Sequence, residues 1–195
     1  MFEFDPIAHR YALDGRELPS VTQILRGLDD FSKVPARVLE QARDRGTRVH
    51  AACNMDVLGT LDENTVDDEV APYLAQFRRF LRESGFQPTL TECRVYDDKL
   101  WYAGTLDIFG DLPGYIDVQI DIKSGAIPRS VGPQTSAYAN GLYKRAGIMT
   151  RKRFVLHLRP NTYSLPRLDS TDDFGAFCQE LRKFNEGVSN DNANG

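Results

Sequence analysis

The sequence predicts an α/β or α+β fold in which helices flank a mixed β-sheet. Two observations carry this prediction. The segment 89–123 reads as strands joined by short turns, with alternating apolar and polar residues in 115–123. Amphipathic helical stripes occupy 70–83, 131–145 and 171–185, with a further strand at 152–159. The resulting order is a hairpin, helices, a three-strand meander, a helix, one or two strands and a helix.

Composition bounds the class of protein. The chain has 195 residues, a length that suits a single domain, and its net charge is -4. We expect one domain over 1–186, comprising an N-terminal hairpin and helices (1–88), a sheet core (89–168) and a C-terminal helix (169–186). A disordered tail is expected at 187–195. The N-terminus shows no secretion signal, so we expect a cytoplasmic protein.

The most informative stretch is Tyr115–Lys123. Asp121 and Lys123 share its polar side, and a hairpin with the preceding strand, 101–109, would place Asp107 beside them. Two neighbouring carboxylates repel each other unless a cation lies between them. The pattern therefore indicates either a divalent metal site with oxygen ligands or a solvated sheet face with a surface ion pair.

A helix predicted from Pro35 carries a second candidate. His50 lies on or beside its apolar stripe, one turn after Gly46. A histidine in this position is either a satisfied core residue or a ligand. A glycine inside a helix costs about 1 kcal/mol relative to alanine, so Gly46 suggests close packing against a neighbour.

Four short motifs then occur in one order on the predicted elements. They are Gly46-Thr47-Arg48-Val49-His50, Gly104-Thr105-Leu106-Asp107, Asp121-Ile122-Lys123 and Gln134-Thr135-Ser136-Ala137-Tyr138. Together they resemble the RecB-like branch of the PD-(D/E)xK nuclease superfamily. The opening hairpin with Pro19-Ser20-Val21-Thr22 is similar to the start of phage-type and mitochondrial-genome-maintenance exonucleases. The resemblance covers roughly residues 8–160.

The resemblance implies a restriction-endonuclease-like core and a Mg²⁺- or Mn²⁺-dependent DNA exonuclease of recombination, repair or replication, with little sequence preference. DNA, as single strands or duplex ends, would be its substrate, and a recombination protein its partner; a phage-encoded enzyme would act in the host cytoplasm. The implied metal ligands are His50, Asp107, Asp121 and the backbone carbonyl of Ile122. The implied catalytic residues are Asp107, Asp121, Lys123, Gln134 and Tyr138.

The sequence alone does not assign a single role to the other candidate residues. Glu92 is either an auxiliary carboxylate or a surface charge. Some relatives hold an iron–sulfur cluster with four cysteines, but this chain has three, so none is expected. Phosphate contacts or ordinary solvated charges are expected at Arg43, Arg45, Arg48, Arg151 and Arg153.

Two further functions remain compatible with the sequence, namely an endonuclease of the same fold and a degenerate DNA-binding relative. The exonuclease hypothesis adds one structural expectation. The residues between His50 and Thr89 should stand beside or over the site and hinder broadside binding of a closed duplex.

Overall fold

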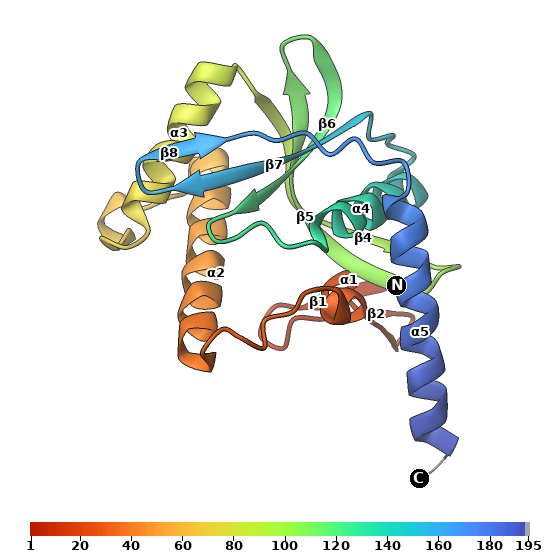
Figure 1. Ribbon diagram of the computed structural model, residues 1–195. Helices are drawn as coiled ribbons and strands as arrows, with labels where there is room; N and C mark the ends of the chain where they lie inside the picture. Colours follow the sequence, from red (N-terminus) through yellow and green to blue (C-terminus); the bar gives the residue numbers. More distant parts are fainter. Residues whose placement is uncertain (194–195) are drawn as a thin grey trace.

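A computed structural model describes residues 1–193, with a five-stranded sheet at its centre (Figure 1). The strand order is β4-β5-β6-β7-β8, formed by Gln87–Asp97, Tyr102–Leu112, Tyr115–Lys123, Lys152–Arg159 and Thr162–Ser164. Neighbouring strands are antiparallel except β6 and β7, which are parallel. The predicted class, a mixed sheet flanked by helices, is confirmed.

The parallel pair explains the position of α4 (Val131–Ala146). Parallel strands cannot be joined by a tight turn, so the chain crosses from β6 to β7 through this helix. The helix ends at Gly147, whose φ of +70° suits a glycine cap. By contrast, β5 and β6 are joined by Pro113-Gly114 alone, a shorter hairpin connection than the sequence suggested.

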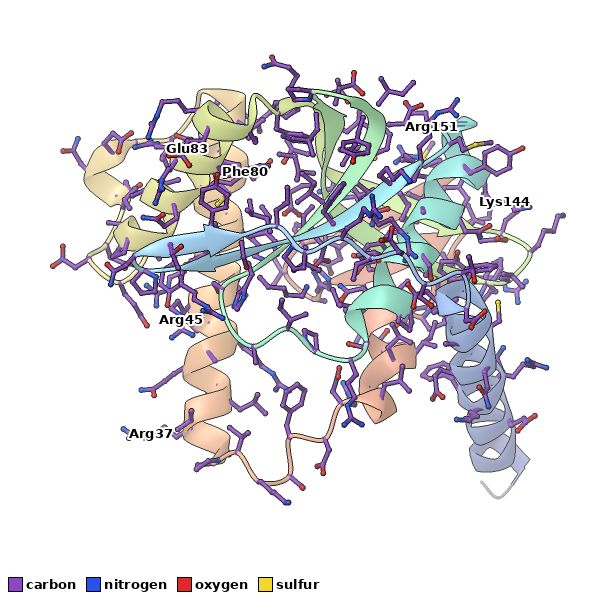
Figure 2. The ribbon with its side chains drawn as sticks, turned by 45° about the horizontal axis from the view of Figure 1, so that its top comes forward. Arg37, Arg45, Phe80, Glu83, Lys144 and Arg151 are labelled. Atoms are coloured by element: carbon purple, nitrogen blue, oxygen red, sulfur yellow. The ribbon has the colours of Figure 1, made fainter. Side chains whose placement is uncertain are left out.

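Helices cover both faces of the sheet. On one face, α2 (Ala36–Leu58) and α3 (Ala71–Ser84) pack with β6 and β7 around Val49, Phe77, Ile120 and Leu156. Figure 2 shows Phe80 on α3, whose ring lies 5.7 Å from that of Tyr163 on β8. Between α2 and α3 lies a short 3-10 helix, η2 (Glu63–Thr65).

The other core forms between α1 (Val21–Ile24), α4, α5 (Asp173–Ala193) and strands β4 and β5. Tyr102, Leu106, Leu142 and Phe177 are among its buried residues. Because both faces are covered, β6 is buried on both sides. Gln119 and Asp121 on its polar side are each only 1% exposed, so the solvated sheet face that the sequence left open as an alternative is wrong.

A second, smaller sheet comes from the N-terminus. It consists of β1 (Phe2–Asp5), β2 (Arg10–Leu13) and β3 (Arg16–Leu18). The turn Asp14-Gly15 has φ values of +51° and +74°, as a tight hairpin turn requires. Ser20 then caps α1 (Val21–Ile24) in a reciprocal arrangement with Gln23, and η1 (Leu25–Leu28) follows.

The first half of α2 and the end of α5 extend beyond the large sheet, and the small sheet lies between them (Figure 1). The backbone of α5 continues through 187–193, which was assigned to a disordered tail, because a single glycine there is not enough to end a helix. Residues 194–195 lie outside the described residues. Among the described helices, none has the length and apolar character that crossing a membrane requires.

Candidate functional site

Three carboxylates form a row across β4, β5 and β6. The pairing of Thr91 with Ile108 places Glu92 opposite Asp107, and the pairing of Ile108 with Ile120 places Asp107 opposite Asp121. Like charges placed directly across a sheet are destabilising. The row therefore needs a partner of opposite charge.

The backbone is strained where this row crosses β4. Glu92 has a φ of +46°, in the left-handed region that non-glycine residues rarely adopt. On β5, Leu106 and Ile108 flank Asp107 in the sequence, but their side chains belong to two different hydrophobic cores. The regular alternation of side chains on this strand is therefore interrupted at Asp107. Strain of this kind gathers at functional sites, where the surroundings hold it in place.

His50 completes the cluster from α2. The last turns of this helix are anchored by buried Val49 and Cys53, and His50 Nδ1 lies 3.5 Å from Asp107 Oδ1. One ligand atom each from His50, Glu92 and Asp107 lies within 4.8 Å of the others. Glu92, which the sequence left as either an auxiliary carboxylate or a surface charge, thus lies together with two of the predicted ligands.

Gly46 plays a different part from the one expected. A Cβ at this position would meet Ser124 Oγ at 3.8 Å, an ordinary contact, so close packing does not require a glycine. The residue instead lines the cleft into which the carboxylate cluster opens.

Asp107 is held by its backbone neighbour on β6. The amide of Ile122 donates a hydrogen bond of 2.7 Å to Asp107 Oδ2. Burial opposes ionisation of Asp107, but His50, Lys123 and this amide together lower its pKa. Burial likewise disfavours the charged imidazole of His50, yet Asp107 outweighs it and raises the pKa of His50 to about 9.

The other two carboxyls shift in the opposite direction. Burial, followed by the charge of Asp107, raises the pKa of Glu92 to about 7. Burial and Asp107 also raise the pKa of Asp121 in spite of the neighbouring Lys123. Without a cation, the cluster therefore holds protons that acidic side chains normally release at neutral pH.

Asp121 provides a direct test of whether a metal fits. Its Oδ2 forms an ion pair of 2.6 Å with Lys123 Nζ, whereas its buried Oδ1 has no hydrogen-bond partner among the described residues. A buried carboxylate oxygen without a partner is costly. The ligand atoms that converge in this structure are those of His50, Glu92 and Asp107, and this imidazole and two carboxylates form a donor set that fits a divalent cation.

Gln134 and Tyr138 lie on one face of α4, as their spacing predicted, and Tyr138 lines the same cleft as Asp107 and Lys123. Gln134 Nε2 donates to the hydroxyl of Tyr138 at 3.0 Å. Burial raises the pKa of Tyr138 well above its usual value, so the phenol stays neutral. Gly104 makes room for this ring, because a Cβ there would lie 2.3 Å from Tyr138 Cε1.

The cluster opens into a cleft of about 1010 Å³. One wall is the small N-terminal sheet, and another is the stretch of α2 from Arg43 to Asn54. Aromatic, cationic and hydroxyl side chains all line it, among them Phe4, His9, Arg43, Arg94, Thr105 and Lys123. No described residue from 59–88 lines the cleft, so the expected cover by the segment before Thr89 is wrong. That segment packs instead against α2, β7 and β8, where its apolar stripe is buried.

The five candidate arginines differ in their surroundings. Arg48 pairs with Asp44, Asp67 and Glu69, and Arg45 pairs with Glu69. Arg151 pairs with Asp117 and Arg153 with Asp173. Figure 2 shows Arg45 and Arg151 on distant parts of the molecule. Of the five, Arg43 is the one that lines the cleft.

The N-terminal sheet is the main contributor that sequence reasoning missed. The hydroxyl of Tyr11 lies 2.8 Å from Thr105 Oγ1, which joins the small sheet to the strand that carries Asp107. His9, for which the sequence pattern indicates no role, has a φ of +49° and lines the cleft. No local pattern signals these contacts, since they link residues far apart in the sequence.

No protein-family model matches this chain, and no match was found among curated proteins. Among solved structures, the chain is similar to the crystal structure of a protein named "Putative exonuclease" from Eubacterium rectale. The TM-score is 0.46 at 9% sequence identity, over 72% of this chain and 63% of the other. A likeness of this degree says nothing about activity, which has to come from the site itself.

Proposed function

We propose that this protein is a divalent-metal-dependent nuclease that hydrolyses DNA phosphodiester bonds with a restriction-endonuclease-like core. The observation that supports this most is the row of three carboxylates across β4, β5 and β6, in which Glu92 and Asp107 converge with His50 and Asp121 pairs with Lys123. A carboxylate cluster that could bind a cation, next to a half-buried lysine that lines the same cleft, provides the groups that phosphate ester hydrolysis needs.

The metal ligands in this proposal are His50, Asp107, Asp121 and the carbonyl of Ile122, and Glu92 extends the set. A bound Mg²⁺ or Mn²⁺ would lower the pKa of a water molecule and polarise a phosphate oxygen. The amide of Ile122 keeps Asp107 ionised and oriented. The ion pair with Asp121 similarly fixes the ammonium group of Lys123.

Lys123 acts on the substrate in this proposal. Its pKa is raised, because Asp121 and Asp107 outweigh the effect of burial, so it carries a full positive charge at neutral pH. A fixed ammonium beside the cluster stabilises negative charge that develops on the phosphate. Gln134 and Tyr138 can donate hydrogen bonds to a phosphate or to the attacking water, since both have polar hydrogens and lie on one helix face.

Exonuclease action fits the shape of the cleft. The N-terminal sheet and α2 wall it on two sides, and His50, Glu92, Asp107 and Lys123 line it between these walls. A strand with a free end can thread between such walls, whereas a closed duplex meets them broadside. No separate element for reading bases is evident in the described chain, so contacts through the backbone should dominate.

The test is digestion of end-labelled linear DNA and covalently closed circles with Mg²⁺ or Mn²⁺. We expect linear DNA to be degraded progressively to short products while circles resist. Rapid nicking of circles would show that the protein is an endonuclease of the same fold and not an exonuclease. Metal binding without any hydrolysis would indicate a DNA-binding relative instead.

A further inference from the structure

The central cleft is part of a longer groove. It shares Phe4, Glu92 and Arg94 with a neighbouring hollow of about 530 Å³. On its other side it shares Arg43 and Lys123 with a hollow of about 370 Å³. The carboxylate cluster therefore lies in the middle of a continuous path, which is longer than one bound nucleotide requires.

Two arginines mark the two sides of this path. Arg94 lies two residues beyond Glu92 on β4, and Arg43 lies two turns before His50 on α2. Neither guanidinium has an ion pair with a carboxylate in the part of the chain that the structure describes, in contrast to Arg45 and Arg48. Cations that line a groove without a carboxylate partner are suited to phosphate groups.

Arg94 is also held in a defined orientation. Its guanidinium lies over the ring of Phe4, 4.5 Å from the ring centroid. Phe4 is itself fixed by Tyr11, whose ring lies 4.9 Å away, and by the edge of His9 at 5.3 Å. Arg94 is exposed and lines both the central cleft and the 530 Å³ hollow, so its side chain is accessible from the groove.

We propose that Arg94, supported by Phe4, is a positioning residue that docks one unpaired nucleotide, through its phosphate and through stacking of its base. The substrate would then be a single strand that passes from Arg94 across the cluster to Arg43. Bases stack on guanidinium planes only when they are free of a duplex, so this arrangement selects unpaired nucleic acid. The inference rests on the proposed nuclease function and names its substrate class.

The test is binding rather than turnover. Fluorescence anisotropy in Ca²⁺ would measure the affinity for a single-stranded dT 12-mer, for an abasic strand of the same length and for a blunt duplex. Arg94→Ala removes both interactions, Arg94→Lys keeps the charge without the plane, and Phe4→Leu removes the support. Arg182→Ala is the matched control, because this exposed arginine on α5 also carries one charge. Circular dichroism would confirm that each variant folds.

We expect Arg94→Ala to bind the dT strand about tenfold more weakly than wild type, with the slope of log Kd against log salt reduced by about 0.7. Arg94→Lys should keep the salt slope but lose the preference for dT over the abasic strand, and Phe4→Leu should show the same loss. Arg182→Ala should match wild type, and wild type should prefer the single strand over the duplex.

Equal affinities of Arg94→Ala and Arg182→Ala would overturn the inference, as would an unchanged base preference in Arg94→Lys. Equal binding of duplex and single strand by wild type would overturn the assignment of substrate. These failures are separable from failure of the nuclease function, which would show as absence of hydrolysis in Mg²⁺ and Mn²⁺ whatever the binding.

Discussion

Tyr138 on α4 lies so close to Gly104 on β5 that a single added carbon at residue 104 would come within 2.3 Å of the ring. The two residues belong to different motifs of the sequence, and their contact fixes the phenol beside Gln134. Gly104 is thus needed for the space it leaves.

Gly104→Ala should therefore displace Tyr138 and destabilise the protein by about 1 to 3 kcal/mol, as overpacking typically does. Urea unfolding monitored by circular dichroism measures this. Gly125→Ala is the control, because no heavy atom lies within 4 Å of a Cβ there. Equal stability of the two variants would show that the ring can move aside freely.

The pKa of Glu92 predicts how the metal-free protein responds to pH. This pKa is raised from 4.5 to about 7 on folding, so the folded protein holds the proton more tightly and loses stability as pH rises from about 4.5 to about 7. Glu92→Gln removes this loss. In EDTA, the variant should exceed wild type by about 1 to 2 kcal/mol at pH 8, since partial exposure weakens the effect, and by much less at pH 5.

Thermal or urea unfolding of both proteins at the two pH values checks this prediction. Exposed Glu186→Gln serves as the control and should differ little from wild type at either pH. A stability gap between Glu92→Gln and wild type that stays constant with pH would contradict the assigned shift.

Lys123→Ala should retain metal binding while losing most turnover, because an ammonium stabilises charge but does not ligate a metal at neutral pH. We expect kcat to fall about a hundredfold or more, with Mn²⁺ affinity by calorimetry within a few-fold of wild type. Exposed Lys99→Ala should leave both unchanged. If metal affinity collapses together with the rate, Lys123 has been given the wrong role.

Mn²⁺ should support hydrolysis at least as well as Mg²⁺, because the imidazole of His50 suits the softer ion. Initial rates at saturating metal concentration provide the comparison, with His50→Asn expected to lose the advantage of Mn²⁺. Strict dependence on Mg²⁺ with inhibition by Mn²⁺ would place His50 outside the metal coordination.

Local patterns predicted much of this arrangement. Alternation placed Asp121 and Lys123 on one side of β6, and the hairpin brought Asp107 beside them. Helical spacing brought Gln134 to Tyr138. Each of these relationships spans few residues or a single turn, so the sequence encodes it locally.

The features that were missed depend on tertiary contacts. Burial of the polar side of β6 depends on α4, which comes later in the chain and packs against this strand. The left-handed backbone conformation of Glu92 cannot be predicted from its residue type, since glutamate seldom adopts this conformation. The wall formed by Phe4 and His9 depends on how two sheets meet, as shown by the contact between Tyr11 and Thr105.

The central claim is that the cluster around Asp121 hydrolyses nucleic acid with a divalent metal. The most direct measurement is the initial rate at which wild type and Asp121→Asn degrade an end-labelled single-stranded oligonucleotide in Mn²⁺, with folding of both checked by circular dichroism. We predict clear metal-dependent hydrolysis by wild type and a rate at least about a hundredfold lower for the variant, because its amide cannot supply the anionic ligand. Hydrolysis by folded Asp121→Asn at close to the wild-type rate would contradict the claim.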